Sequence, residues 1–271
     1  MRRVAVTGMG IISSIGSNLE EFWESLKLGR SGIDWIDTFD VSEFGSKVAG
    51  RVKNFDPISY MEKREAKRTA RFVQMAIASA SEAYSDSGLE EGLFNSETAG
   101  VIYGVGLGGM DVIEDQHLIL MDKGPSRITP FLIPMTIANM APGLLAIRFG
   151  FKGTNFTIST ACASGTNAIG EATRLIRSGV LDVAMTGGSE ATITPLTLAG
   201  FSNMTALSRG TPESASRPFD SKRDGFVIAE GSATLIIEEY EHALRRGARI
   251  YGEIVGYGST DDAFHITSPE E

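Results

Sequence analysis

The chain has 271 residues, 42% of them hydrophobic and 22% charged, which is typical of a globular protein and unlike a disordered chain. Its formal net charge of −9 argues against nucleic acid or an anionic membrane as the main partner. No stretch is long and apolar enough to span a bilayer, and one cysteine cannot form an internal disulfide. We therefore expect no membrane association and a reducing, cytoplasmic compartment.

Strand and helix patterns alternate along the chain. Within residues 64–89, for example, apolar side chains recur every three or four residues, as in an amphipathic helix. The alternation predicts an α/β fold with a mainly parallel or mixed sheet covered by helices, and the polar stretch 208–225 is predicted to be a loop. We expect strands at 2–8, 46–52, 98–106, 155–160, 181–188, 231–239 and 249–260, and helices at 19–29, 64–89, 110–121, 136–149, 162–178 and 239–247.

A glycine-rich turn follows the strand predicted at 98–106. Its sequence "GVGLGG" (104–109) matches the G-x-G-x-x-G pattern that binds dinucleotides when it lies between a strand and a helix. The acidic residue expected at the tip of the following strand is missing, because Asp122 falls at the end of a predicted helix. A nicotinamide-dependent (NAD) oxidoreductase is therefore the weaker alternative. The other interpretation is that these glycines let a helix approach the sheet closely.

The stretch "STACASG" (159–165) contains the one cysteine, Cys162, between a predicted strand and a predicted helix. Its small neighbours leave room for a substrate, and the amides at the start of the helix can favour a thiolate. The corner is similar to a nucleophile elbow, although Thr160 stands at the first glycine position of that motif. We predict that Cys162 is a nucleophile; a buried structural cysteine is the alternative.

A nucleophilic cysteine usually needs a partner that handles protons, and none is evident in this sequence. His117 and His242 lie in charged helical stretches and are expected at the surface. His265 lies in a polar loop, where nothing marks it as a base.

Seven motifs taken together resemble the N-terminal part of the beta-ketoacyl-[acyl carrier protein] synthases, most of all synthase II of fatty acid elongation. The resemblance covers essentially the whole chain. The motifs are "RRVAVTGMGIISSIG" (2–16), "GVGLGGM" (104–110), "PFLIPMTIANM" (130–140), "STACASG" (159–165), "GGSEA" (187–191), "RPFDSKRDGFVIAEGSA" (217–233) and "DAFHITSP" (262–269).

The resemblance implies the thiolase fold, a layered α-β-α-β-α sandwich made of two similar halves. Residues 1–249 would form the N-terminal half, and residues 250–271 the first strand and loop of the C-terminal half. It also implies a homodimer that uses neither a cofactor nor a metal.

The resemblance also implies an activity. The active cysteine of the family, matched by Cys162, takes an acyl group from acyl carrier protein, whose 4′-phosphopantetheine arm carries acyl and malonyl groups. The malonyl group then loses carbon dioxide, and the resulting carbanion attacks the acyl thioester, with the amide of Cys162 in the oxyanion hole. Leu107 matches the gate of the acyl pocket and Phe201 falls near the acyl chain, while Leu132 and Ile133 match a segment that enters the partner's pocket.

The sequence departs from the family in one important respect. The family's two catalytic histidines and a lysine come from C-terminal segments that match nothing here. We therefore expect a fragment that does not condense acyl groups by itself. A non-catalytic, chain-length-controlling subunit with the same fold is a further alternative, but such subunits typically lack the cysteine.

Cations gather in the predicted helix at 64–89 and just before it. They recur at three- and four-residue steps and predict a basic stripe on one helix face. Such a stripe can attract an acidic partner despite the negative net charge, so we expect it to dock acyl carrier protein. A merely solvated surface is the alternative. The cations are Lys63, Arg64, Lys67, Arg68 and Arg71.

Overall fold

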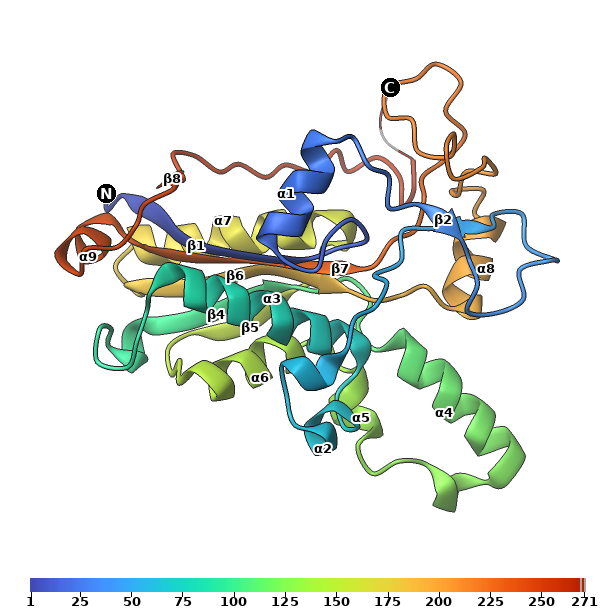
Figure 1. Ribbon diagram of the computed structural model, residues 1–271, viewed down its shortest axis with the longest axis horizontal. Coiled ribbons are helices and arrows are strands. Elements are labelled where there is room, and N and C mark those ends of the chain that lie inside the picture. The colour runs from blue at the N-terminus through green and yellow to red at the C-terminus, as the bar shows by residue number, and fades with distance from the viewer. Residues whose placement is uncertain (269, 271) are drawn as a thin grey trace.

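The computed structural model describes residues 1–268 and 270 and is organised around a six-stranded mixed sheet (Figure 1). The strands lie in the order β5-β4-β6-β7-β1-β8, with β4 parallel to β5 and β6 and the remaining neighbours antiparallel. They are β1 (Val4–Ile12), β4 (Ala99–Gly104), β5 (Asn155–Ile158), β6 (Val183–Glu190), β7 (Gly231–Glu239) and β8 (Gly252–Glu253), and a separate two-stranded sheet pairs β2 (Asp34–Trp35) with β3 (Val48–Ala49).

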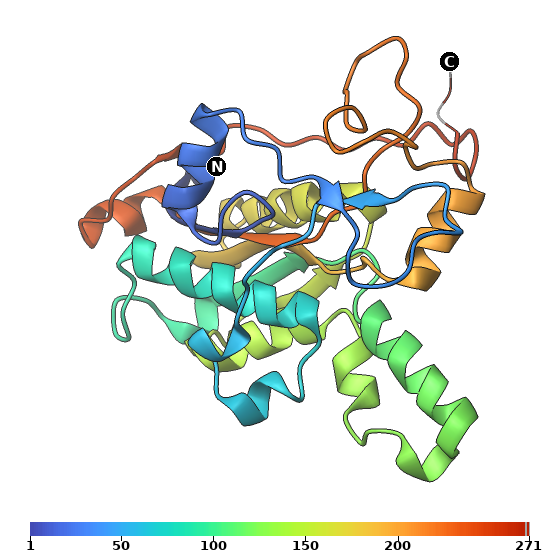
Figure 2. The same cartoon turned by 45° about the vertical axis from the view of Figure 1, so that its right-hand side comes forward.

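Helices cover both faces of the large sheet. Helices α3 (Arg71–Ser87) and α6 (Met140–Phe149) lie on one face and α7 (Ser164–Arg177) on the other, as Figures 1 and 2 show. Alternate strand residues therefore enter different cores, with Ile236 on the α3 side and Ile237 on the α7 side. The other helices are α1 (Leu19–Lys27), α2 (Lys63–Ala66), α4 (Met110–Lys123), α5 (Leu132–Thr136), α8 (Pro195–Asn203) and α9 (Tyr240–Arg245), with short 3-10 turns η1 (Pro57–Ser59), η2 (Ser96–Thr98), η3 (Pro125–Arg127) and η4 (Ala161–Ala163).

The predicted α/β class and mixed sheet are confirmed, and the residues described form three layers, α/β/α. The loop predicted at 208–225 contains no helix or strand. Within the described residues, no helix has the length and apolar character needed to cross a bilayer.

The helix predicted at 64–89 is wrong in one respect, because it is broken into α2 and α3. The hydroxyl of Thr69 donates hydrogen bonds back to the carbonyls of Glu65 (3.0 Å) and Ala66 (3.4 Å), which competes with helical pairing. Ala70, with φ −71° and ψ 158°, then begins a new helix. The apolar stripe of this region is confirmed, since Phe72, Met75, Ala76, Ala80 and Ala83 are all buried.

Three further predictions differ from the structure. The helix expected at 136–149 starts only at Met140, after the separate short helix α5. The strand expected at 249–260 pairs only at Gly252–Glu253, where it adds to the edge of the sheet beside β1. Helix α8 was not predicted, although Pro195 follows Thr194, whose side chain accepts a hydrogen bond from the amide of Thr197 and so caps the helix.

Helices α4 and α5 project from the sheet as a separate arm, which is visible in both orientations (Figures 1 and 2). The arm rejoins the body through α6, which packs on α3 and β5. Large apolar side chains on this arm stay exposed, among them Leu118, Met121 and Ile133.

A buried carboxylate joins β7 to α9. Glu238 is fully buried and binds His242 (2.7 Å to Nδ1), Arg246 (2.9 Å to Nε) and the hydroxyl of Thr7. Burial alone would raise the pKa of Glu238, but hydrogen bonds from Arg246, His242 and Thr7 outweigh it and hold the pKa at about 2. The surface position expected for His242 is therefore wrong, because its side chain is 16% exposed and packs into this cluster.

We expect this cluster to make the fold acid-sensitive. A carboxylate whose pKa is lower in the folded state than its ordinary 4.5 stabilises the fold above that value. This contribution is lost as the pH falls towards about 2. Glu238→Gln should reduce the free energy of unfolding at neutral pH by about 3 kcal/mol, because Arg246 is left buried without its counter-charge. Urea unfolding measured from pH 7 to pH 3 should show a smaller pH dependence in this variant, and the exposed Glu241→Gln should behave like the unsubstituted chain.

Candidate active site

Cys162 stands at the corner between β5 and α7. Ala161, just before it, has φ +50°, a conformation that residues other than glycine rarely adopt. The side chain of Ser164 holds the corner, accepting a hydrogen bond from the amide of Thr160 (2.9 Å) and donating one to the carbonyl of Ala161 (2.7 Å). The predicted nucleophile elbow is therefore present in geometry: a strained turn presents an exposed cysteine at the start of a helix.

Two glycines let this corner rest directly on the sheet. A Cβ atom at Gly104 would lie 2.4 Å from the carbonyl carbon of Ser164, and one at Gly188 would lie 3.3 Å from the Cα of Gly165. Since these glycines are in β4 and β6, Cys162 stands at the carboxyl ends of the parallel strands, where open α/β sheets usually bind ligands.

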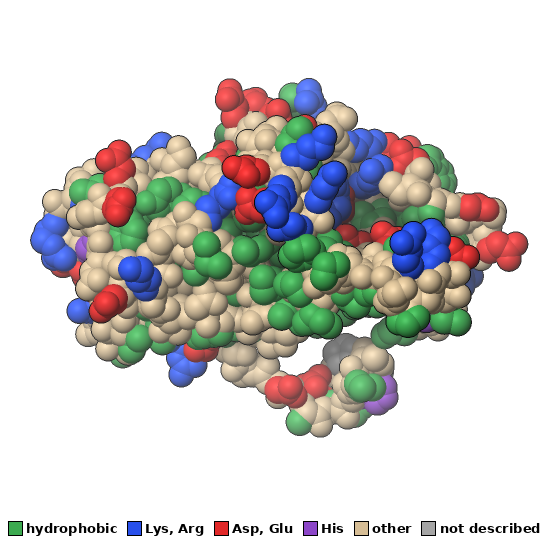
Figure 3. All heavy atoms as spheres, turned by 90° about the horizontal axis from the view of Figure 1, so that it is seen from below, with side chains coloured by type: hydrophobic (Ala, Val, Ile, Leu, Met, Phe, Trp, Pro, Cys, Tyr) green, Lys and Arg blue, Asp and Glu red, His purple; other side chains and the backbone are tan. Residues whose placement is uncertain are grey.

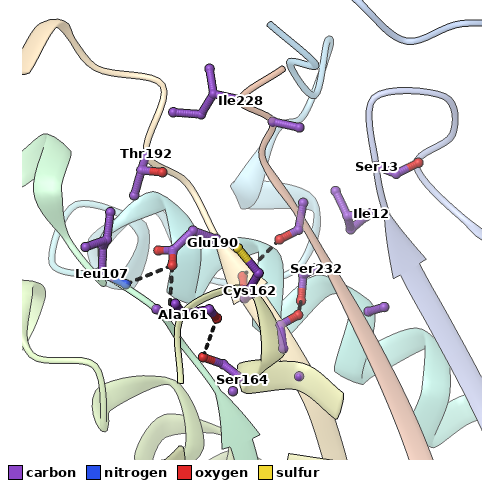
Figure 4. Close-up of a pocket in the computed structure, with 18 of the residues that line it drawn as sticks. Ile12, Ser13, Leu107, Ala161, Cys162, Ser164, Glu190, Thr192, Ile228 and Ser232 are labelled. Atoms are coloured by element: carbon purple, nitrogen blue, oxygen red, sulfur yellow. Dashed lines mark hydrogen bonds between the residues drawn. The ribbon is translucent and has the colours of Figure 1, made fainter. Parts of the chain in front are cut away.

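The sulfur faces a pocket of about 780 Å³. Leu107 and Phe201 line the pocket together with Cys162, so the structure brings these three predicted residues together. Figure 4 shows the side chain of Glu190 between Leu107 and Cys162. Further parts of the wall come from residues 226–229, from β7 at Ser232 and from the end of β1 at Ile12.

Leu132 and Ile133 do not line this pocket. Both belong to α5, where Leu132 packs against the core on the α3 side and Ile133 is 63% exposed. Their expected place is the pocket of a partner subunit, and this stays a prediction.

The carboxylate of Glu190, at the end of β6, lies in the glycine-rich turn that resembles a dinucleotide-binding loop. One carboxylate oxygen, Oε2, accepts hydrogen bonds from the amides of Gly106 and Leu107 (both 2.8 Å), and the other accepts one from Gly108 (3.2 Å). These are the amides that would hold a pyrophosphate, so the structure argues against the oxidoreductase alternative. Glu190 belongs to the motif "GGSEA", but no feature of the sequence indicates this role for its side chain.

The pocket offers no evident base for Cys162. Among the described residues that line it, Glu190 is the other titratable side chain and no histidine is present. His117 is exposed on α4, as expected, and His265 is exposed near the C-terminal end of the described chain. The loop motif 262–269 that contains His265 ends at Pro269, which lies outside the described residues, as does Glu271. The described residues contain no cluster of His, Cys, Asp and Glu arranged to hold a metal ion.

The basic stripe predicted on one helix is not continuous, because α2 ends at Ala66 and the cations fall on α2, on the link that follows it and on α3. Lys63, Arg64, Lys67 and Arg68 are exposed, and none forms an ion pair with another described residue. Arg71 does not belong with them, because it binds the buried Glu230 through two hydrogen bonds of 2.7 and 2.8 Å.

We call these four exposed cations the α2 basic patch. Neighbouring residues leave the positive charge of this patch largely unopposed. Glu65, the acidic residue inside the patch, faces Arg148 at 3.4 Å. Arg68 lies over the ring of Phe131, 4.3 Å from its centroid, which ties the patch to the start of α5. From the side of α2, α5 and α6, Lys and Arg side chains gather beside an apolar area (Figure 3).

Comparison with known proteins identifies the family and the fold. The family described as beta-ketoacyl synthase, N-terminal domain, matches residues 1–243. The chain belongs to the beta-ketoacyl synthase family. It is 51% identical over 270 residues to 3-oxoacyl-[acyl-carrier-protein] synthase 2 of Synechocystis, covering 99% of this chain and 65% of that relative.

Solved ketosynthase structures share the same fold. A beta-ketoacyl synthase from Burkholderia phymatum superposes with a TM-score of 0.90 at 31% identity, covering 99% of this chain and 67% of that one. A type II PKS ketosynthase, solved in complex with its acyl-carrier protein, superposes with a TM-score of 0.84 at 32% identity, covering 97% of this chain and 64% of that one. The predicted family and thiolase-like fold are thus confirmed.

We expect Gly104→Ala to disturb the corner. Its new Cβ would meet backbone atoms 2.4 and 2.5 Å away, so the start of α7 must move. The free energy of unfolding should fall by about 1–3 kcal/mol in urea titrations. Gly143→Ala is the matched control, since nothing lies within 4 Å of that position in α6, and it should be neutral or slightly stabilising. Equal stability and equal alkylation of Cys162 in both variants would contradict the close packing described here.

Proposed function

We propose that the protein is a 3-oxoacyl-[acyl-carrier-protein] synthase of fatty acid elongation, with Cys162 as the acyl-carrying nucleophile. The observation that carries this proposal is the exposed sulfur on a strained corner at the start of α7, facing a pocket large enough for an acyl chain. The identity of 51% to a synthase 2 supports it, although the chain spans only 65% of that relative.

The first step is transfer of the acyl group. The sulfur of Cys162 attacks the carbonyl carbon of the thioester on the phosphopantetheine arm of acyl carrier protein. The bond from that carbon to the phosphopantetheine sulfur then breaks, and this sulfur leaves with the proton that Cys162 gave up. The amide of Cys162, just before α7, would donate a hydrogen bond to the carbonyl oxygen and so stabilise the negative charge that develops there.

The second step is decarboxylating condensation with malonyl carrier protein. The malonyl group loses carbon dioxide, and the carbanion left behind forms a carbon–carbon bond to the acyl carbon. The bond from that carbon to the sulfur of Cys162 then breaks, and the released thiolate takes a proton from solvent to restore the free thiol. The family uses a histidine pair for decarboxylation, and the described residues lining the pocket include no histidine. We therefore expect this chain alone to take up an acyl group without condensing it.

The acyl group would lie beside Leu107 and Phe201, which line the pocket with Cys162. Leu107 is 47% exposed and borders the pocket from the glycine-rich turn, a position suited to a gate. The function needs a free thiol at Cys162, which fits a cytoplasmic location.

Acyl carrier protein would dock on the α2 basic patch. The patch has four exposed cations in a chain of net charge −9, and its internal Glu65 is already paired. A local positive area of this kind attracts an acidic partner.

A homodimer would form through the free edge of β5. This strand is the outer strand of the sheet, pairs only with β4 among the described residues, and exposes Phe156. Unpaired strand edges readily add a strand from another chain. Since the side chain of Asn155 binds the carbonyl of Pro142 in α6, pairing at β5 would bring the α5–α6 segment to the partner.

The alternative of a chain-length-controlling partner subunit is the weaker proposal. Such a subunit would not need an exposed cysteine on a strained corner.

Replacing the nucleophile tests the proposed function. The unsubstituted chain, incubated with acyl-loaded carrier protein, should gain one acyl group, seen by intact-protein mass spectrometry. Cys162→Ala should reduce this adduct to background, because the attacking sulfur is removed while the exposed site keeps its fold. An adduct on Cys162→Ala, or none on the unsubstituted chain, would count against the proposal.

Charge reversal tests the docking surface. Lys63→Glu combined with Lys67→Glu should weaken carrier binding about tenfold at low salt, and the difference should shrink as salt is added. The exposed Lys152→Glu is the control, because it lies near the start of β4, at the opposite end of the sheet from Cys162. Equal affinities measured by calorimetry at low salt for all three proteins would rule out this surface.

A further inference from the structure

Leu107 stands on a turn whose ends are fixed by the main body of the protein. Before the turn, the amide of Val105 donates to the carbonyl of Ile158 (3.0 Å). After it, the amide of Gly109 donates to the carbonyl of Thr136 (3.2 Å), at the end of α5. Between these two points, the amide of Leu107 has the carboxylate of Glu190 as its acceptor.

Glu190 holds the middle of the turn through three hydrogen bonds. It is the last residue of β6 and accepts from Gly106, Leu107 and Gly108. Burial raises the pKa of Glu190, and backbone amides provide the hydrogen bonds that oppose this effect. The carboxylate is therefore bound to the turn itself.

The turn is shaped to receive this carboxylate. A Cβ atom at Gly106 would lie 2.6 Å from Oε2 of Glu190, so a side chain there would displace the carboxylate. Gly108 has φ +81°, in the region that favours glycine, which turns its amide toward the same side chain. The presence of glycine at positions 106 and 108 is thus explained by the binding of the Glu190 carboxylate.

We propose that Glu190 is a positioning residue for the acyl pocket: by fixing the turn at 106–108, it sets where Leu107 stands and so limits the length of chain that reaches Cys162. This inference rests on the proposed function, in which Leu107 borders the acyl group. Figure 4 shows the hydrogen bond from the Leu107 amide to Glu190 beside the Cys162 sulfur.

Replacing the carboxylate should release the turn. In Glu190→Gln, the side-chain NH₂ group faces at least one of the three amide donors, so two donors oppose each other. In Glu190→Asp the charge is kept, but the side chain is one methylene shorter and cannot hold all three amides at these distances. Leu107 is already 47% exposed, so a released turn can carry it away from the pocket.

The test compares alkylation of Cys162 by N-butyl and N-octyl iodoacetamide. Both reagents react with the same thiolate, so the ratio of their rate constants cancels any change in the reactivity of the sulfur and reports on room for the longer tail. Glu190→Gln should raise the octyl-to-butyl ratio about fivefold, and Glu190→Asp should raise it less. The exposed Glu91→Gln is the matched control and should leave the ratio unchanged.

Hydrogen exchange gives a second readout on the same proteins. Amides in the peptide 105–109 should exchange about tenfold faster in Glu190→Gln, while amides of α3 keep their protection. A general loss of protection would mean that Glu190 only supports the fold, and this would overturn the proposal. If Glu190→Gln does not fold, Glu190→Asp carries the same two measurements.

The outcomes separate this inference from the proposed function. Failure of the unsubstituted chain to take an acyl group from carrier protein overturns the proposed function, while the alkylation ratio still reports on Glu190. Normal acyl uptake with an unchanged octyl-to-butyl ratio in a folded Glu190 variant overturns the positioning role alone.

Discussion

The start of α7 touches the sheet at a distance that only glycine allows. Gly104 in β4 and Gly188 in β6 have no side chain where the backbone of residues 164 and 165 passes. This contact brings the corner at Ala161 and Cys162 down onto the carboxyl ends of the parallel strands. The pocket, the exposure of the sulfur and the position of the glycine-rich turn all depend on this approach.

Strand β7 links the pocket to the stability of the fold. Near its beginning, Ser232 lines the pocket and binds the hydroxyl of Tyr103 (2.9 Å), which also binds Thr234 (2.8 Å). At its other end, Glu238 gathers Arg246 and His242. Buried polar groups that are all paired fix one arrangement of the core, so both ends of this strand specify the register of the sheet.

The exposed surface has a charged area at α2 and an apolar area at β5, α5 and α6. The α2 basic patch owes its positive charge to four cations that pair with no described residue and to Arg148, which pairs with Glu65 inside the patch, whereas Arg71 turns inward to Glu230 and does not contribute. The free edge of β5 and the exposed side chains of α5 and α6 present apolar groups instead. An acidic carrier and a second subunit would therefore contact neighbouring areas by different forces.

Local patterns in the sequence were sufficient for the strands β1, β4, β5, β6 and β7, for the buried face of α3, and for the turn that presents Cys162, because periodicity and small-residue composition act within a few neighbours. The break between α2 and α3 depends on the Thr69 hydroxyl, which donates to backbone carbonyls instead of to water. The spacing of apolar residues in the sequence does not reveal this hydrogen bond. The inward turn of Arg71 and the partly buried position of His242 depend on Glu230 and Glu238, and Arg71 lies more than a hundred residues from its partner in sequence. Glu190 shows the same limit most clearly. The strand predicted at 181–188 stops two residues before it, and only the folded sheet brings its carboxylate to the amides of residues 106–108, because that contact joins strands that are neighbours in space and far apart along the chain.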